Sequence, residues 1–391
     1  MRNQGKRKRV ALVMGLTDTY EHGIARGIVR YARGRKDWDL YGYGWMFRPF
    51  DALEVWRGEG IIARIESSEQ ARLIEGLSAP VVDVAGAYSM KSFATVTNDD
   101  ELTGSRAGHY LAACGFRRFG FCGVSGTGWS TRRQDGFREA VRRIDPAPAV
   151  FGESLPWWET LDTSGRLRSW IAGLRQPVGI FAANDTAGVK LADLCRDLGI
   201  AVPESIAILG VDNEDILCEM TSPTLSSIEL DCETIGYRAA AVLDEMMKAP
   251  ARARPPVRSL LVPPKDVMER ESTRVYACED PLVEKAMRFI RRYGTGHLTV
   301  GGILAAVPAS RRSLETRFKK ATGRTLRAEI VRVRLAHARA LLRTTNLTVG
   351  DVAAECGFGS AQRFHEAFRE TEGVSPGRYR RGAGRQRDGR P

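Results

Sequence analysis

Acidic and amide side chains stand just after several short apolar runs in the first two thirds of the sequence. They are Asp18, Asn184, Asp185, Asp212 and Asn213. A carboxylate accepts hydrogen bonds and an amide both donates and accepts them, each in fixed directions. Such groups at the mouth of a pocket favour binding of a small polar ligand such as a polyol.

The same carboxylates raise an alternative, because Asp99, Asp185 and Asp212 are able to exchange protons with a substrate. No nucleophile–base motif accompanies them, and the sequence has no Cys/His cluster, G-x-G-x-x-G pattern or P-loop. We therefore expect no catalysis, no metal and no cofactor. An enzyme that uses these carboxylates for acid–base chemistry remains the alternative.

The elements that position these residues alternate between strand and helix from residue 10 to about residue 273. Apolar runs typical of buried strands are Val10–Leu16, Gly60–Ile65, Pro80–Val84, Phe119–Gly123, Val178–Ala183 and Ser205–Val211, and helical segments are Gly23–Arg33, Leu102–Cys114, Gln134–Arg143 and Ala187–Leu198. This alternation predicts parallel sheets with helices on both faces. Its length favours two lobes over a single sheet, with ligands bound beyond the carboxyl ends of the strands.

The positive charge is concentrated at the end of the chain. The 391 residues carry a net charge of +12, yet residues 282–391 hold 23 Lys and Arg against 9 Asp and Glu, a net charge of +14. A polyanion such as DNA is therefore expected as a partner of the last quarter alone. A solvated basic tail accounts for the arginines after residue 378, but not for those spread through the preceding helices.

The cysteines and the N-terminus indicate a cytoplasmic protein. Seven cysteines are scattered without a C-x-x-C pair, which favours buried, reduced thiols. The basic start is followed by an apolar run that is too short for a signal peptide and lacks a cleavage site. No segment is long enough to span a membrane.

The remaining boundaries come from breaker residues and local charge. We predict a basic N-terminal extension at 1–9, a linker at 274–281 and a disordered basic tail at 383–391. Asp280 and Pro281 are typical of a helix cap followed by proline in the first turn.

Thr348–Phe368 predicts two short helices joined by a glycine turn. Thr348 and Asp351 have the spacing of a capping box, and Ser360 is placed to cap the second helix. Phe364 and Phe368 lie four residues apart, on one face. This pattern is that of a helix-turn-helix, whose second helix enters a DNA major groove. An ordinary helical hairpin in a core is the alternative.

A similar unit occurs upstream, in Leu298–Phe318. Thr299 and Ser310 are its expected caps, and Pro308 lies in its turn. The segment Ala328–Arg343 has apolar residues at helical spacing and connects the two units. Two such units would reach successive major grooves, about 34 Å apart.

Residues 282–382, which end in Gly373–Arg380, resemble the AraC/XylS-type DNA-binding domain. The resemblance implies that exposed residues of each recognition helix read bases, namely Arg312, Glu315 and Thr316 in the first unit and Gln362, His365 and Glu366 in the second. The neighbouring cations are better suited to phosphates, and they are Arg311, Arg317, Lys319, Lys320, Arg363 and Arg369. Pro308 departs from the family pattern, in which glycine is usual at the turn.

The preceding region resembles the core of LacI-type regulators, which is similar to periplasmic sugar-binding proteins. The matching segments are Ala182–Ala187, Leu198–Pro203 and Ile208–Asn213. By position, the resemblance implies that Asp99, Arg133, Asn184 and Asp212 bind sugar hydroxyls. Asp100 departs from the family, which usually has asparagine there. Asn and Asp after strands also cap helices, and this remains the alternative for each residue.

Aromatic side chains are candidates for stacking on a sugar ring. Tyr20, Trp129, Trp157 and Trp158 lie in stretches that read as loops, with Trp129 the strongest candidate because it precedes Arg133. An ordinary place in the core is the alternative for each of them.

With its two regions in this order, the chain resembles a family of xylose-responsive regulators over nearly its full length. Further matches are Trp56–Ile62, Gly210–Glu214 and Leu261–Pro264. This implies a transcription activator controlled by a sugar, with a pentose such as xylose as the effector. By analogy with the family we expect a homodimer that contacts RNA polymerase and no membrane. Two alternatives stay open. One is a first domain that senses a non-sugar ligand such as a nucleobase, or that serves only dimerisation, and the other is a sugar-modifying enzyme with a DNA-binding tail.

Overall fold

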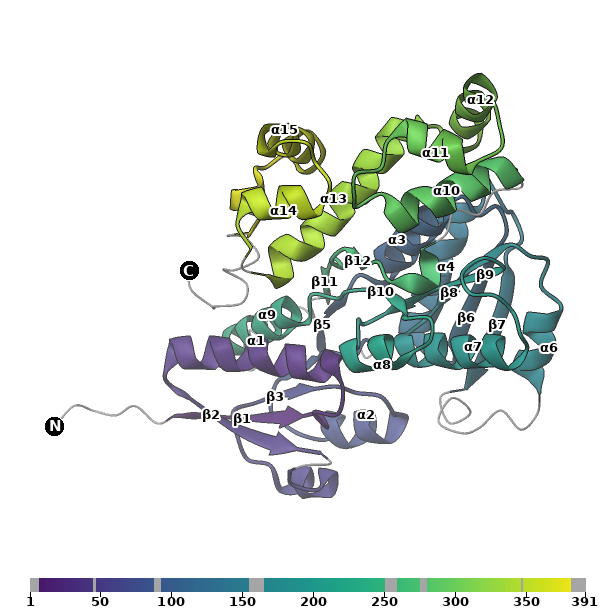
Figure 1. Ribbon diagram of the computed structural model, residues 1–391. Helices are drawn as coiled ribbons and strands as arrows, with labels where there is room; N and C mark the ends of the chain where they lie inside the picture. The colour runs from purple at the N-terminus through teal and green to yellow at the C-terminus, as the bar shows by residue number, and fades with distance from the viewer. Residues whose placement is uncertain are drawn as a thin grey trace. The chain divides into compact units, whose positions relative to one another are not determined.

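The structure is a computed structural model that describes residues 7–44, 47–87, 93–154, 165–249, 259–274, 280–345 and 347–380. It divides into two compact units, Met1–Thr273 and Arg274–Pro391 (Figure 1). The predicted tail at 383–391, most of the predicted linker and most of the N-terminal extension lie outside the described residues. No described helix is both long enough and apolar enough to cross a membrane.

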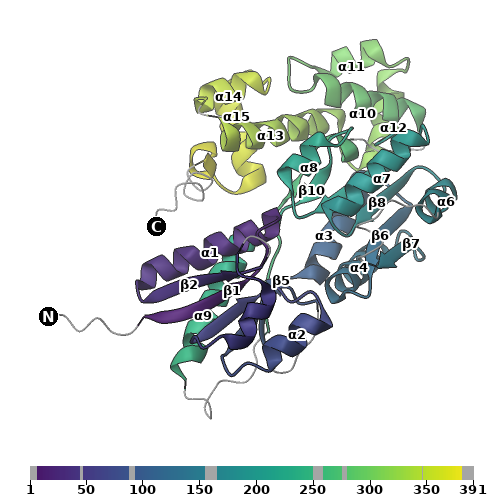
Figure 2. The same cartoon turned by 90° about the horizontal axis from the view of Figure 1, so that it is seen from below.

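The first lobe of the first unit is built on a six-stranded sheet of order β11-β5-β4-β3-β1-β2. Its strands run parallel and are β1 (Lys8–Val13), β2 (Trp38–Tyr43), β3 (Gly60–Ala63), β4 (Val81–Asp83), β5 (Ala94–Asn98) and β11 (Ser259–Val262). Helices α1 (Thr19–Arg35) and α9 (Cys232–Lys248) lie side by side on one face (Figures 1 and 2). The other face packs on α2 (Ser68–Glu75) and the 3₁₀ helix η1 (Phe50–Val55).

Glycines allow α1 and α9 to approach closely. A Cβ atom on Gly27 would lie 2.1 Å from the Glu233 carbonyl oxygen, and one on Gly236 would lie 1.9 Å from the Ile24 carbonyl oxygen. Only glycine fits such backbone contacts. This packing fixes the position of the α1 N-terminus, which carries Asp18 and Tyr20.

The second lobe has a sheet of order β12-β10-β9-β8-β6-β7, parallel except for β12. The strands are β6 (Phe119–Ser125), β7 (Ala149–Ser154), β8 (Val178–Ala182), β9 (Ile206–Val211), β10 (Ser226–Ile228) and β12 (Val267–Met268). Its helices are α3 (Asp100–Ala113), α4 (Gly128–Val141), α6 (Arg166–Ala172), α7 (Asp185–Asp197) and α8 (Asp215–Met220), followed by the 3₁₀ helix η3 (Glu271–Thr273). Buried phenylalanines from β6, β8 and α4 fill the side toward α3 and α4.

Three described segments connect the lobes: from β5 to α3, from β10 to α9 and from β11 to β12. Backbone hydrogen bonds join them, with the Asp99 amide donating to the Val262 carbonyl at 2.8 Å and the Lys265 amide donating to the Glu229 carbonyl at 2.8 Å. Short parallel crossings of this kind allow one lobe to rotate against the other about a hinge.

The second unit is all helical. Its helices are α10 (Pro281–Tyr293), α11 (Val300–Ala306), α12 (Arg311–Thr322), α13 (Leu326–Thr344), α14 (Val349–Glu355) and α15 (Ala361–Glu372). One core gathers α10, α11, α12 and the start of α13, and a second gathers the rest of α13 with α14 and α15. The predicted caps Asp280, Thr299, Ser310, Thr348 and Ser360 are confirmed, including the capping box of Thr348 with Asp351. The predicted fold class, a two-lobed α/β domain followed by two helix-turn-helix units, is thus confirmed.

Candidate functional site

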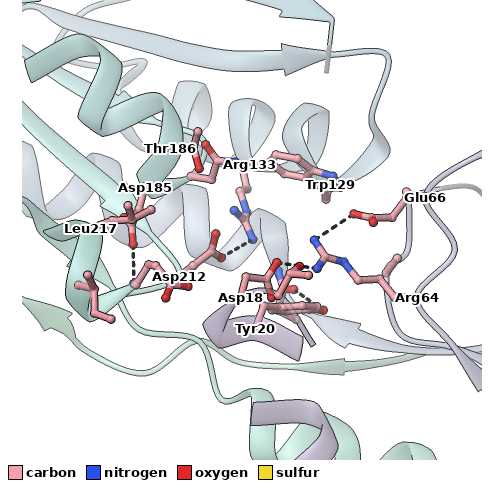
Figure 3. Close-up of a pocket in the computed structure, with 17 residues that line it drawn as sticks. Asp18, Tyr20, Arg64, Glu66, Trp129, Arg133, Asp185, Thr186, Asp212 and Leu217 are labelled. Atoms are coloured by element: carbon pink, nitrogen blue, oxygen red, sulfur yellow. Dashed lines mark hydrogen bonds and ion pairs between the residues drawn. The ribbon is translucent and has the colours of Figure 1, made fainter. Parts of the chain in front are cut away.

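A cavity of about 500 Å³ opens between the two lobes, at the carboxyl ends of their strands (Figure 3). The first lobe contributes residues after β1, β3, β4 and β5, and the second contributes residues from α4 and from the ends of β8 and β9. The polar and aromatic lining residues are Thr17, Asp18, Tyr20, Arg64, Glu66, Asn98, Trp129, Arg133, Asn184, Asp185, Thr186, Asp212 and Glu214. This size suits a small molecule such as a monosaccharide.

Arg133 is the buried cation of the cavity, with 4% of its surface exposed. Its Nε donates to Asp100 at 2.9 Å, and its Nη1 donates to the Ala183 carbonyl at 2.5 Å. Its Nη2 lies 3.9 Å from the Asp212 carboxylate, toward which the guanidinium points in Figure 3. Asp100, the residue that departs from the family pattern, thus holds the arginine in place.

Asp212 ends β9 in a backbone conformation that is rare for a residue with a side chain. Its φ is 102° and that of Asn213 is 52°. Strain of this kind persists at sites where the surroundings fix it. Here the Asn213 amide donates to Ser227 at 3.0 Å, and the Glu214 amide donates to Asp185 at 2.8 Å.

The two carboxylates at the ends of β8 and β9 are poorly solvated. Removal of water raises the pKa of Asp212 to about 8, against the opposing charge of Arg133. The same cause raises the pKa of Asp185 to about 7, although Ser227 donates to it at 2.7 Å. Loss of solvation destabilises the carboxylate anion more than the neutral acid, and the pKa therefore rises. A ligand that donates hydroxyl hydrogens to these oxygens would restore part of the lost solvation.

The positions carried over from the family resemblance divide in two. Arg133, Asn184 and Asp212 line the cavity together. Asn184 also caps α7 by accepting from the Ala187 amide at 2.9 Å, which leaves its Nδ2 group to donate to a ligand. Asp99 is not among the lining residues, because its carboxylate caps α3 by accepting from the Leu102 amide at 2.9 Å. The cavity is lined instead by its neighbour Asn98.

A second charged group lines the cavity from the first lobe, and the sequence did not point to it. The guanidinium of Arg64 lies 2.6 Å from Asp18, 2.9 Å from Glu66 and 3.3 Å from Glu21 (Figure 3). Arg64 directly follows β3, so the rule that selected Asp18 applies to it as well. It was missed because the predicted strand continued to Ile65, which placed Arg64 within the sheet.

Two of the aromatic candidates, Tyr20 and Trp129, lie on helices and not in loops, which corrects the expectation for them. Tyr20 is in the first turn of α1 and donates its hydroxyl to the Val84 carbonyl at 2.7 Å. Trp129 is in the first turn of α4, with its ring centre 5.0 Å from the Arg133 guanidinium. Both line the cavity. Trp157 and Trp158 lie outside the described residues.

Several hydrogen bonds join the lobes beside the cavity, and one of them is from Arg132 Nη2 of α4 to the Gly86 carbonyl of the first lobe at 3.1 Å. The Thr19 amide, at the start of α1, donates to Glu214 Oε2 at 2.7 Å. In the described part of the chain, the cavity included, no cluster of three or more His, Cys, Asp or Glu side chains is arranged to hold a metal ion. The six described cysteines are buried, free thiols.

In the second unit, α12 and α15 each bury one face and expose another. Leu314 and Phe318 are fully buried on α12, as are Phe364 and Phe368 on α15. The residues assigned to bases lie on the opposite faces, where Arg312, Thr316, Gln362, His365 and Glu366 are exposed and Glu315 is half-buried. The cations assigned to phosphates, Arg311, Arg317, Lys319, Lys320, Arg363 and Arg369, are exposed on the same two helices.

Two ion pairs and one hydrogen bond within the unit already engage some of these groups. Arg311 donates to Glu315 at 3.0 Å, and Gln362 donates to Glu366 at 3.1 Å, both across one helical turn. Arg317 donates to Asp280 at 2.5 Å. Exposed pairs of this kind are weak, about 0–1 kcal/mol, so DNA is able to displace them.

The two turns have different chemistry. In the second unit Gly357 has a φ of 70°, and a Cβ atom there would lie 2.1 Å from the Gly296 carbonyl oxygen. In the first unit α11 ends at Val307 in an extended conformation with a φ of −110°, so the following Pro308 needs no glycine geometry. Ser310 still caps α12.

Comparison with known proteins agrees with this architecture. Residues 9–97 match the family described as the XylR N-terminal domain, residues 109–273 a periplasmic binding protein-like domain and residues 303–382 a helix-turn-helix domain. The xylose operon regulatory protein of Escherichia coli strain K12 is 30% identical over 386 residues, which cover 96% of this chain and 97% of that protein. The protein of the same name from Haemophilus influenzae is 27% identical and covers 95% of this chain and 98% of its own length.

A solved structure, described as that of the xylose-binding transcription activator xylR, is similar over 96% of this chain and 98% of that one. The sequence identity is 29% and the TM-score is 0.62. These relatives are regulators of transcription, which confirms the prediction that the chain is not an enzyme. The chain therefore belongs to the family of xylose operon regulatory proteins, DNA-binding transcription regulators that join a periplasmic-binding-protein-like domain to an AraC-type helix-turn-helix domain.

Proposed function

We propose that the chain is a transcription activator controlled by a pentose, with D-xylose as the first candidate, bound in the cavity between the lobes. The observation that carries the proposal is the meeting of Arg133, Asn184 and Asp212 from three separate elements at one cavity. Together they offer a guanidinium, an amide and a carboxylate, which donate to and accept from sugar hydroxyls in fixed directions. Asn98 and the Arg64 group supply further partners from the first lobe.

Trp129 completes this proposed binding site. An indole presents a flat apolar face, and the apolar C–H face of a pyranose ring packs on such a surface. The Arg133 guanidinium already lies against this ring, so the same side chain both orients Trp129 and faces Asp212. Asp99 takes part only as the cap of α3.

The proposed DNA contacts lie on α12 and α15. Arg312 is suited to guanine, Gln362 to adenine, and Glu315 and Glu366 to the amino group of cytosine. Thr316 and His365 lie on the same faces. Arg311, Arg317, Lys319, Arg363 and their neighbours supply phosphate contacts, which add affinity without base choice.

Sugar binding controls DNA binding by favouring one arrangement of the lobes. A pentose that touches both lobes binds more tightly to the closed form, and it shifts the equilibrium only by that difference in affinity. In a homodimer the shift would change the spacing of the helix-turn-helix units on paired DNA sites. The activator role follows the name of the similar solved structure, and contact with RNA polymerase is proposed by analogy with the AraC/XylS family.

A ligand screen by thermal shift tests the proposal. Xylose, arabinose, ribose, glucose and two purines would each be added at 100 times the expected Kd, where a bound ligand stabilises the fold by about 2.7 kcal/mol. We expect a pentose to raise the Tm and purines to leave it unchanged. A shift with purines alone would replace the sugar with a nucleobase, and no shift with any ligand would refute the cavity assignment.

A variant ties the shift to this cavity. Asp212→Asn keeps the shape of the side chain but replaces one of its oxygens with an NH2 group that only donates, so the sugar shift should shrink or vanish. Arg133→Ala is a poorer choice, because it would break the buried ion pair between Arg133 and Asp100. Such a loss destabilises a fold by about 3–5 kcal/mol on its own.

A further inference from the structure

The short helix α8 contacts both the ligand cavity and the opposite lobe. Ile216 and Leu217 of α8 line the cavity, and Glu214 at its N-terminus accepts from the Thr19 amide of the first lobe at 2.7 Å. The strained turn that precedes α8 carries Asp212. A change in the occupancy of the cavity or in the angle between the lobes therefore acts directly on this turn and helix.

A single arginine joins this helix and turn to the last residues of the first unit. Arg270 Nε donates to Glu219 of α8 at 2.7 Å, and its Nη2 donates to the Asn213 side chain at 2.9 Å. Its Nη1 donates to the Leu225 carbonyl at 3.0 Å. Only 13% of the side chain is exposed, so all three guanidinium nitrogens are engaged in a largely dry setting.

The segment that follows Arg270 is anchored firmly and leads out of the unit. Ser272 is fully buried and donates to the Ile208 carbonyl at 2.6 Å. Thr273 donates to Ser226 at 2.7 Å and contacts the Tyr110 hydroxyl at 2.8 Å. The first unit ends at Thr273, and the chain continues from there toward the DNA-binding helices. Arg270 therefore lies on the anchored segment that leads directly to the linker.

We propose that Arg270 is the positioning residue that couples the sugar cavity to DNA binding. Its guanidinium binds the side chains of Asn213 and Glu219, beside the cavity. Its backbone leads to Thr273, the last residue of the first unit. Arg270 does not line the cavity. It acts through the turn that carries Asp212 and through α8. The inference rests on the proposed sugar response of the same cavity.

The test compares coupling with binding in the full chain. D-xylose is the probe, and DNA selected from a random pool by the wild-type chain is the target. Fluorescence anisotropy gives the DNA Kd with and without D-xylose, and calorimetry gives the sugar Kd. The ratio of the two DNA Kd values is the coupling, which in allosteric proteins is about 5- to 150-fold.

Arg270→Ala should bring this ratio to within about twofold of 1, while the sugar is still bound and the sugar-free DNA Kd stays within about threefold of wild type. Arg270→Lys keeps the charge but cannot form the fork, so it should recover less than half of the logarithm of the ratio. Glu219→Gln, at a position with 63% of its side chain exposed, tests the same path without risk to folding and should weaken the ratio in part.

Arg196→Ala is the matched control, because Arg196 pairs with Asp193 at the same distance of 2.7 Å on an exposed face of α7. It should keep the wild-type ratio. An unchanged ratio in Arg270→Ala would overturn the proposal, and so would loss of sugar binding in both Arg270 variants, which would make Arg270 a support of the cavity alone. A wild-type chain that binds both ligands without coupling would refute the proposed sugar response itself.

Discussion

At the scale of single residues, the cavity combines two charged groups of different origin. Arg133 and Asp100 belong to the second lobe, whereas Arg64 with Asp18 and Glu66 belongs to the first. Each arginine is paired with carboxylates of the protein itself. The proposed pentose would therefore meet arginines held in place, and little side-chain freedom would be lost on binding.

Arg312 tests the assignment of base-reading residues. Arg312→Ala should weaken binding to the selected DNA by about 1–3 kcal/mol and relax base choice at one position. Anisotropy with DNA variants at each position measures both effects. Lys320→Ala, on the same helix, serves as control, because the loss of a phosphate contact weakens binding to all DNA sequences equally. Equal loss on all sequences for Arg312→Ala would assign Arg312 to a phosphate.

Asp212 gives the stability of the ligand-free chain a dependence on pH. Its pKa is about 8 in the fold and about 3.9 in an unfolded chain, so the folded state holds a proton that the unfolded state releases. The resulting stabilisation is complete below about pH 4 and is lost as the pH rises through about 8. Asp185, with a pKa of about 7, acts in the same direction.

Asp212→Asn removes this group and gives the measurement. As the pH rises from 6 to 9, the Tm of the wild type should fall relative to the Tm of the variant. Scanning fluorimetry in a series of buffers without sugar is sufficient. Parallel curves over that range would show that Asp212 titrates normally.

At the scale of elements, two glycines that follow helices of the second helix-turn-helix unit have the same backbone conformation but different surroundings. Gly357 requires a positive φ and has a backbone oxygen where a Cβ atom would be, whereas Gly373 has a φ of 71° with no atom within 4 Å. Both Gly→Ala variants pay the conformational cost of about 1–2 kcal/mol. Only Gly357→Ala also pushes α14 away from Gly296.

The pair of variants isolates that contact. Hydrogen exchange of amides in α14 and α15 should speed up considerably more in Gly357→Ala than in Gly373→Ala, because local opening becomes easier. Amides of α11 and α12 serve as the internal reference, since they belong to the other core. Equal effects of the two substitutions would mean that the Gly296 contact contributes nothing.

The helices of the DNA-binding unit were predictable because their signals are local. Capping residues at Thr299, Ser310, Thr348 and Ser360 mark the starts of helices within a few residues of sequence. Strands rich in buried aliphatic residues, such as Val178–Ala182, were equally clear. Strand β5 was missed because its sequence, Ala94–Asn98, has two threonines and an asparagine and resembles a polar loop.

The omissions in the cavity follow from the omissions in the sheet. Asn98 ends the strand that was missed, and Arg64 was counted inside a strand that ends one residue before it. Trp129 and Tyr20 were expected in loops, because glycine, threonine and serine around them hide the first turns of α4 and α1. The role of Asp99 as a cap depends on where α3 begins, which sequence patterns locate poorly.

At the scale of the whole molecule, two functions are divided between two units of opposite charge. The region before residue 282 has 36 Lys and Arg against 38 Asp and Glu, whereas the rest has a net charge of +14. The polyanion is thus attracted to the second unit, and the uncharged sugar enters a cavity of the first. Such a division requires a coupling between the units if the sugar is to control DNA binding.

The central claim is that a pentose in the cavity and DNA on the helix-turn-helix units influence each other. The most direct measurement is a reciprocal titration: the Kd for D-xylose with and without selected DNA, and the Kd for DNA with and without D-xylose, in one buffer. Linkage requires the two ratios to be equal, and we expect a common factor of about 5 to 150. Tight binding of both ligands with a factor of 1 would contradict the claim.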